Sequence, residues 1–268
     1  PVVKNDEREI LNRAYPTPYF FSARVFSQID LVSIELQKVY RQTDSVFVSV
    51  LDHIRTNTAG AADLQLLNTR YGSHIEESEA DMYITLATRR DTVDSINEKK
   101  LAELAGEPIT FEGSIEGDFP ESSLPTSQEL VLKPGAQIIF IKNDFDRRWV
   151  NGTIGVIAGI DEEEETIYVI TDDGKECDVK RESWRNIRYR YNEKTKEIEE
   201  EVLGSFTQYP IRLAWAITVH KSQGLTFSRV VIDFTGGVFA GGQAYVALSR
   251  CTSLDGIQLK KPINRADI

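Results

Sequence analysis

The order of predicted strands and helices constrains this chain more than any other feature. A buried strand over 82–87 leads into a helix that Asp91 caps. Much later in the chain, a strand over 229–234 leads into a helix over 243–250. Strand followed by helix is the repeating unit of a parallel α/β sheet, so we expect both stretches to belong to one α/β domain.

Between these two units the chain has a different texture, with short strand-like segments in place of helices. These segments lie at 137–141, 153–160, 166–171 and 175–179. Asn151-Gly152 and Asp173-Gly174 are dipeptides typical of hairpin turns. Short strands at close spacing predict a small barrel of the SH3-like kind. We expect an α/β domain (1–127 and 205–268) interrupted by an all-β insertion over 128–204.

Aromatic side chains in the insertion are expected to pack inside it. Trp149 follows Arg147 and Arg148 at a predicted hairpin tip, where a basic and aromatic pair could also contact nucleic acid. We favour an inward-facing Trp149. Trp184 and the Tyr189–Tyr191 stretch are likewise expected to be barrel packing.

The first block of the chain mixes helices and strands. Thr17-Pro18 resembles a helix start, and a strand is predicted over 33–39. Asp44 should cap a helix that ends near Ile54. We expect the aromatic side chains after Thr17 to be core rather than a base-stacking platform: Phe20, Phe21 and Phe26.

Three further elements complete the prediction. A helix over 63–70 can end at Gly72 in a left-handed cap. A short helix is expected through 215–220, and a last strand near 256–259.

Charge limits what the chain can bind. The net charge of −11 argues against nucleic-acid binding by bulk electrostatics. From Thr207 to Ile268, however, seven Lys/Arg face three Asp/Glu, a local charge of +4. A nucleic-acid site here must therefore be a local groove. Two distant cysteines without metal or redox spacing, and no long apolar run, predict an intracellular, cytoplasmic protein without a metal site or membrane span.

A dense group of polar side chains lies within 214–226. Thr218, His220, Lys221 and Ser222 precede Gly224. Hydroxyl, imidazole and ammonium groups at this spacing can hold a phosphodiester backbone while leaving the bases unread. Taken alone, His220 is more often a structural histidine, and no hydrolase motif supplies it with a nucleophile.

Arg250 ends the run Ala-Leu-Ser-Arg at 247–250. A guanidinium stays charged and can bind phosphate oxygens in two places, which suits the charge that builds up in phosphoryl transfer. Taken alone, Arg250 is more often an arginine that stabilises a helix end.

Together these runs resemble the RecD-like and PIF-type branch of superfamily 1 helicases. Residues 211–232 are similar to motif V and residues 243–251 to motif VI. Val39 to Gln42 resembles motif IV, and residues 133–155 resemble the start of the SH3-like domain 2B. Pro1-Val2-Val3 is similar to the end of motif III.

The resemblance implies roles for matching positions in a RecA-like domain 2A. Arg250 would face the γ-phosphate of ATP. Arg41 would be a second phosphate contact, although it could instead form a salt bridge at a strand end. Gln223 and Gly224 would lie on the nucleotide side. A third group would contact single-stranded DNA: Thr218, His220, Lys221 and Ser222, with Thr88 or Arg89 as backbone contacts. For Thr88, Arg89 and Arg90 a solvated loop is the competing interpretation.

One departure from the family is large. No Gly-x-x-x-x-Gly-Lys-Ser/Thr loop occurs in the 268 residues. We therefore expect the carboxyl-terminal half of a helicase, partnered by an N-terminal RecA-like domain that would hold ATP and Mg²⁺. Alone, the chain should be inactive. The family suggests 5′-to-3′ movement. The alternative is a non-catalytic nucleic-acid or protein-binding module.

Overall fold

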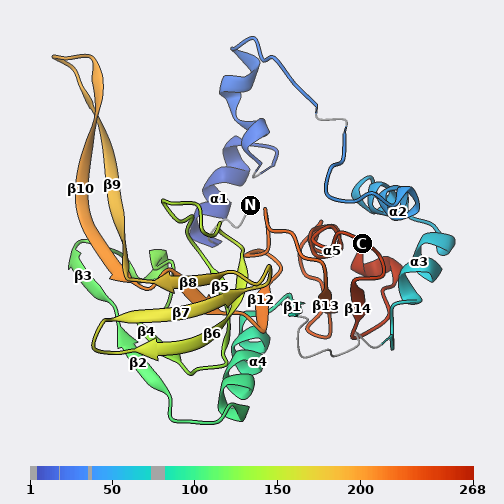
Figure 1. Ribbon diagram of the computed structural model, residues 1–268. Coiled ribbons are helices and arrows are strands. Elements are labelled where there is room, and N and C mark those ends of the chain that lie inside the picture. The colour runs from blue at the N-terminus through green and yellow to red at the C-terminus, as the bar shows by residue number, and fades with distance from the viewer. Residues whose placement is uncertain (1–4, 18, 36–37, 74–81) are drawn as a thin grey trace. The chain divides into compact units, whose positions relative to one another are not determined.

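The computed structural model describes residues 5–17, 19–35, 38–73 and 82–268 (Figure 1). The chain divides into two compact units, residues 1–39 and residues 40–268. Each unit is described by itself. In the described part of the chain, no helix is long and apolar enough to cross a membrane.

The first unit holds helix α1 (Asn5–Ala14) and two 3₁₀ turns, η1 (Phe20–Ser22) and η2 (Arg24–Ser27). The expected helix after Thr17 is wrong, because Ala23 has an extended backbone and separates the two turns. Pro18 lies outside the described residues. No strand forms over the described parts of 33–39, and residues 36–37 lie outside them.

The aromatic residues of the first unit do not form a core. Phe20 and Phe21 are 75% and 59% exposed, and Phe26 is only partly buried. The rings pack on one another instead, with 5.5 Å between the centroids of Phe20 and Phe21 and 5.7 Å between those of Phe20 and Phe26. Because no sheet of the first unit's described part lies against them, the expected burial is wrong.

The second unit contains the expected parallel sheet. Its strands lie in the order β12 (Ala216–Thr218), β1 (Ile84–Ala87), β13 (Val230–Asp233) and β14 (Ile257–Leu259). All neighbours pair in parallel, and Leu86 lies opposite both Ile217 and Ile232. Their apolar side chains form one core with helices α2 (Ser45–Arg55), α3 (Ala61–Asn68) and α5 (Gln243–Leu248).

The helix expected over 215–220 is wrong, since Ala216–Thr218 is a strand. Thr85 donates its backbone N–H to the carbonyl of Trp215, and parallel pairing with β1 continues to Thr218. β-Branched residues such as Ile217 and Val219 favour this extended conformation. Pairing of β12 with β1 at the edge of the sheet therefore outweighed the local sequence pattern that predicted a helix.

Helix starts follow the expected chemistry in one case and not in another. Asp44 caps α2, accepting from the backbone N–H of Val46 at 2.9 Å. Helix α4 (Arg90–Glu103) begins one residue before Asp91, and its N-cap, Arg89, makes no side-chain cap. Asp91 lies in the first turn, where a carboxylate still favours the helix dipole.

Antiparallel strands occupy the chain between α4 and β12. A five-stranded sheet has the order β11-β5-β6-β7-β8, a three-stranded sheet β3-β10-β9, and a two-stranded sheet β2-β4. Their bounds are β2 Ile109–Glu112, β3 Ser114–Gly117, β4 Glu129–Leu132, β5 Gln137–Phe140, β6 Ile154–Asp161, β7 Thr166–Thr171, β8 Glu176–Val179, β9 Glu182–Asn192, β10 Glu197–Gln208 and β11 Ile211–Leu213. Two 3₁₀ turns, η3 (Glu121–Ser123) and η4 (Arg265–Asp267), complete the elements. An all-β region therefore interrupts the parallel sheet, over a longer stretch than 128–204.

Aromatic packing in this region follows the prediction only in part. Trp149 is buried as expected, with its ring centroid 4.4 Å from that of Phe140. Trp184 stacks on Phe206. Tyr189 and Tyr191 are exposed, so their expected packing is wrong. They lie on the long β9–β10 hairpin, which extends away from the other strands (Figure 1).

Candidate nucleotide and nucleic-acid interface

Arg41 and Gln42 fasten the start of the second unit to the end of α5. Arg41 donates from Nε to Thr226 Oγ1 at 2.8 Å and from Nη1 to the carbonyl of Ser249 at 3.1 Å. Gln42 is buried and donates from Nε2 to the carbonyls of Ser249 and Cys251, at 3.0 and 2.8 Å. Sequence reasoning did not single out Gln42. Its position beside Arg41 was the available signal.

Arg250 lies next to Arg41 and is only 8% exposed. Its Nε donates to the carbonyl of Val246, Nη1 to that of Leu225, and Nη2 to Ser249 Oγ, at 2.9, 3.2 and 2.9 Å. Burial lowers the pKa of Arg250, and the charge of Arg41 lowers it further. Within the described chain, neither arginine has a carboxylate within ion-pair distance. The pair is suited to polyanionic phosphate.

Gln223 and Gly224 lie at the exposed tip of the loop that presents Leu225 to Arg250. Gly224 has a φ of 85°, a left-handed conformation that a side chain would strain. Ser222 is fully buried and donates to the carbonyl of Val219 at 2.7 Å. Its hydroxyl therefore holds the turn, and the expected DNA contact by Ser222 stays a prediction.

An open hollow of about 490 Å³ lies at the carboxyl ends of β1 and β12. Ligands of parallel α/β sheets usually bind at this edge. Four of the predicted DNA-contacting residues line the hollow: Thr88, Arg89, Thr218 and His220. Arg90, Asp91 and the aromatic residue Phe239 complete its lining. The structure thus brings together residues 130 positions apart, whereas Lys221 does not line the hollow.

Polar groups of the hollow differ in how far they are already engaged. The hydroxyl of Thr88 is buried and has no hydrogen-bond partner among the described residues. Arg89 donates from Nε to the carbonyl of Gly236 at 2.8 Å, and its other guanidinium nitrogens make no hydrogen bond to the described residues. Thr218 Oγ1 accepts from the backbone N–H of Lys221 at 3.4 Å. The hydroxyl of Thr88 is thus an unpaired but buried group in the wall of the hollow.

Phe239 is a residue that sequence reasoning missed. Its ring is 63% exposed and lies 6.2 Å from the ring of His220, tilted by 31°. Buried Gln243 fixes the segment, because its Oε1 accepts from the backbone N–H groups of Phe239 and Ala240 at 3.1 and 3.3 Å. The sequence offered one indication of this exposed ring, since Phe239 lies between the glycine pairs Gly236-Gly237 and Gly241-Gly242.

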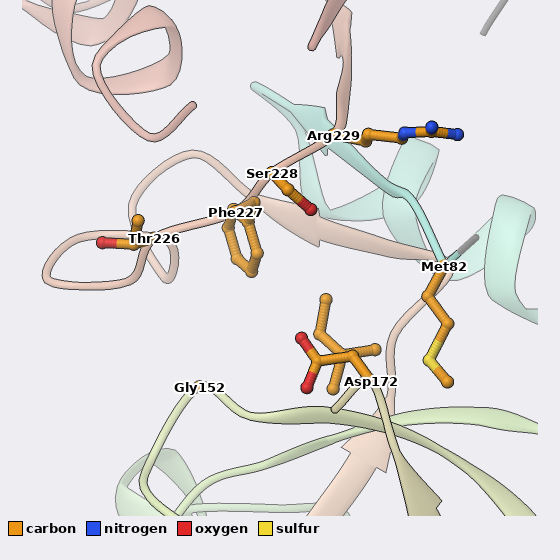
Figure 2. A pocket seen from close by; sticks show the side chains of 8 residues that line it. Met82, Gly152, Asp172, Thr226, Phe227, Ser228 and Arg229 are labelled. Carbon is orange, nitrogen blue, oxygen red and sulfur yellow. The ribbon is translucent and has the colours of Figure 1, made fainter. Parts of the chain in front are cut away.

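A smaller cavity, of about 130 Å³, separates the turn at Gly152 from the segment Thr226–Arg229. Figure 2 shows the carboxylate of Asp172 on the far side of this gap from Phe227. Burial raises the pKa of Asp172, as does the charge of Asp173. A Cβ at Gly152 would lie 2.5 Å from Leu225 Cδ2. The antiparallel region therefore packs directly on the loop that accepts the hydrogen bond from Arg250.

The charged side chains of the described site suit the phosphate groups of a nucleotide better than a magnesium ion bound to them. Two cationic groups, Arg41 and Arg250, converge on one loop. Over the described ranges, no three His, Cys, Asp or Glu side chains are grouped to hold a metal ion.

No family model matches the chain, but individual proteins do. It is 32% identical over 267 residues to the "ATP-dependent DNA helicase Pif1" of Campylobacter jejuni, covering 94% of this chain and 58% of that protein. It is 34% identical over 250 residues to the human "ATP-dependent DNA helicase PIF1", covering 91% of this chain and 37% of that protein. The chain thus spans less than two thirds of the curated relatives it matches.

Solved structures give the same result. The chain matches Bacteroides Pif1 in complex with ADP-AlF4 with a TM-score of 0.84 and 37% identity, over 100% of this chain and 60% of that one. It matches the Bacteroides Pif1 structure bound to single-stranded DNA with a TM-score of 0.72 and 38% identity, over 100% and 61% of the two chains.

Proposed function

The chain is a homologue of the Pif1 DNA helicases that spans part of their length, and we propose that it is the carboxyl-terminal half of such an ATP-driven motor. In this proposal the parallel sheet is the RecA-like domain 2A and the antiparallel region contains an SH3-like domain 2B. The convergence of Arg41 and Arg250 on the loop at Leu225 and Thr226 is the observation that carries it.

On the nucleotide side, Arg250 supplies positive charge to the γ-phosphate of ATP. Its guanidinium first has to leave the carbonyl of Leu225, so exchange of that acceptor for a phosphate oxygen couples the nucleotide to the loop. Arg41 provides a second cation and shares the carbonyl of Ser249 with Gln42. Magnesium would neutralise phosphate charge from ligands outside this arginine pair.

On the DNA side, the hollow holds a single strand. Thr88, Arg89 and Thr218 offer donors to the backbone, while His220 and Phe239 present rings to the bases. The loop between Thr218 and Leu225 links the hollow to Arg250, since Thr218 lines the hollow and the carbonyl of Leu225 accepts from Arg250. Movement of this loop would therefore affect both sites. We propose 5′-to-3′ movement on DNA, which rests on the resemblance to the family.

Arg250 gives the sharpest test of the motor. In the full-length protein that contains this chain, Arg250→Ala should lower DNA-stimulated ATP hydrolysis by about 10³-fold, because an arginine facing the transferring phosphate is worth about 10³–10⁵ in rate. Arg250→Lys keeps the charge but loses the planar fork, and should recover only part of the rate.

The control is Arg188→Ala on the exposed β9–β10 hairpin, which changes the net charge equally. Its hydrolysis rate should equal that of the wild type. Normal hydrolysis by a folded Arg250→Ala protein would overturn the motor proposal and favour a binding module. The 268-residue chain alone should bind DNA without hydrolysing ATP.

A further inference from the structure

The outer half of the β9–β10 hairpin, residues 187–192 and 197–202, has two different faces. Directly opposite residues of antiparallel strands lie on one face, and the faces alternate along each strand. One face is mostly apolar and consists of three such pairs: Ile198 with Tyr191, Glu200 with Tyr189, and Val202 with Ile187. Four of its side chains are between 52% and 70% exposed. Apolar side chains gathered on one exposed face are typical of a surface that another molecule covers.

The opposite face of β10 carries an acidic row, which consists of Glu197, Glu199 and Glu201. Only part of its charge is balanced within the hairpin. Glu201 pairs with Arg190 on β9, with 2.8 Å between Oε2 and Nε. Over the whole outer half, two arginines stand against four glutamates, a net charge of −2. The two faces of β10 thus differ in chemistry, one apolar and one acidic.

Strand β10 has a free edge on the side away from β9. In the sheet order β3-β10-β9, strand β3 lies on this side but pairs only with Gly204–Thr207. β3 ends at Gly117, where a Cβ would lie 2.5 Å from the carbonyl oxygen of Leu203. Among the described residues, no strand pairs with this edge over 197–202, and the hairpin extends away from the other strands there (Figure 1). Every second residue of the edge therefore offers a backbone N–H and C=O to an added strand.

We propose that the edge of β10 over 197–202 binds an extended segment of another protein in which apolar and basic residues alternate. A strand added at this edge places every second side chain beside Ile198 and Val202, and the intervening side chains beside the acidic row. Apolar residues suit the first set of positions and Lys or Arg the second. This inference goes beyond the proposed motor and does not depend on it.

Charge argues against two other occupants of the edge. A second copy of the chain, added through its own β10, would set one acidic row against another, because directly opposite residues share a face. A DNA strand would meet the net negative charge of the outer half. A basic segment is attracted by the same carboxylates.

The first test uses a fluorescein-labelled octapeptide of alternating valine and lysine. It is titrated with the 268-residue chain at about 0.15 M salt, where attraction between distant charges is screened. A block peptide, with the valines first and the lysines after them, has the same composition and charge. It should bind about 10-fold more weakly, because only alternation matches both faces of β10. Equal affinities of the two peptides would overturn the inference.

Backbone methylation distinguishes strand pairing from attraction between side chains. One peptide carries N-methyl groups on its valines and another carries them on its lysines. In a paired strand, the N–H groups of only one of these sets face β10. One methylated peptide should therefore lose binding and the other should keep it, whereas equal affinity of the two would contradict pairing at the edge.

Ile198→Ser tests the apolar face. It should weaken binding of the alternating peptide about 10-fold, because an isoleucine side chain that the peptide covers is lost. Ile170→Ser is the matched control, since it removes an isoleucine that is 40% exposed on β7, in another sheet. An Ile198→Ser protein with the affinity of Ile170→Ser would remove the apolar face from the site.

A double variant, Glu197→Gln with Glu199→Gln, tests the acidic row without altering the apolar face. Binding should weaken about 5-fold and depend less on salt, since two charge pairs with lysine are lost. The control is Glu162→Gln with Glu163→Gln, which removes the same charge from the exposed turn between β6 and β7. Equal affinity of the two double variants would show that the acidic row makes no contact.

Two further measurements identify a wrong occupant. If sedimentation shows a dimer that Ile198→Ser converts to a monomer, the edge binds a second copy. If Ile198→Ser weakens binding of labelled oligo-dT as much as it weakens peptide binding, the surface contacts DNA. Either result would overturn the inference. Phe239→Ala, which tests the DNA-binding hollow, should leave peptide binding unchanged, so the two proposals can fail separately.

Discussion

At the scale of single residues, Phe239 is the aromatic residue of the proposed DNA-binding hollow. Its ring is exposed on a short connection bounded by glycines. The side-chain carbonyl of Gln243 holds that connection by accepting from the backbone N–H groups of Phe239 and Ala240. An exposed aromatic ring beside the imidazole of His220 offers two faces to unpaired bases without reading their edges. The backbone is therefore shaped to present Phe239 rather than to bury it.

Replacing Phe239 tests that surface. Phe239→Ala should weaken binding of the chain to oligo-dT about 10-fold, because stacking of a base on an aromatic ring is worth roughly 1–3 kcal/mol. Phe239→Trp should bind as well as the wild type. Fluorescence anisotropy at low salt measures both.

Phe145, which is 96% exposed on a turn of the antiparallel region, supplies the control. Phe145→Ala should have the affinity of the wild type. If Phe239→Ala also binds oligo-dT with the affinity of the wild type, the Phe239 ring does not contact DNA.

At the scale of elements, the contact between α4 and β12 positions the site. Asn97 is buried, and its side-chain amide forms hydrogen bonds with both the carbonyl and the backbone N–H of Ala216. Thr218 and Arg90 lie at the ends of these two elements, so their separation depends on this contact. A helix that only packed by apolar contact could slide along the strand.

Asn97→Ala should therefore lower the free energy of unfolding by about 2–4 kcal/mol, since two buried backbone groups lose their partner. Urea unfolding followed by circular dichroism measures the change. Ser95→Ala, on the exposed face of the same helix, should change it by less than about 0.5 kcal/mol. An Asn97→Ala protein as stable as Ser95→Ala would show that apolar packing alone holds α4.

The turn at Gly152 links the antiparallel region to the nucleotide side. Its φ of 99° requires glycine, and a Cβ there would overlap Leu225. Leu225 in turn accepts from Arg250. The two regions thus meet at the contact between Gly152 and Leu225, directly beside the hydrogen bond from Arg250.

For the second unit as a whole, acid stability depends on carboxylates held in the ionised form. Asp233 lies buried at the end of β13, where hydrogen bonds from Thr235 and Lys260 lower its pKa below 3.8 against the opposing effect of burial. Because the folded pKa is the lower one, Asp233 stabilises the fold above the unfolded value, and this contribution is lost as pH falls toward the folded pKa.

Stability of the wild type should thus decline below about pH 4, whereas Asp233→Asn should be less stable at pH 7 and lose less on acidification. Thermal melts between pH 7 and pH 3 measure the difference. Asp255→Asn is the control, because that carboxylate is 96% exposed. Parallel loss of stability in wild type and Asp233→Asn would contradict the assignment.

Predictions from local pattern succeeded where one interaction dominates. Asp44 caps α2 because the backbone N–H of Val46 lies two residues away in sequence. They failed where distant contacts decide. Ala216–Thr218 became a strand through pairing with β1. Tyr189 is exposed because, in the part of the chain that the structure describes, no other sheet covers that end of the β9–β10 hairpin.

The candidate site divides in the same way. Arg41, Arg250 and His220 could be named from their motifs, because phosphate chemistry demands particular side chains at particular spacings. Gln42 lay within the motif IV-like run without a role of its own, and Phe239 lay in no motif, since an amide or a ring shows no role until its neighbours are known.

The sequence by itself determined the chemistry of this protein: an α/β chain with an all-β interruption, and two arginines and a polar loop of a helicase type. Tertiary structure alone decided which of those groups meet. It buried Ser222 and opened a hollow beside Phe239. The physical reason is that side-chain type is local, whereas burial and proximity of charges arise from strands and helices far apart in the chain.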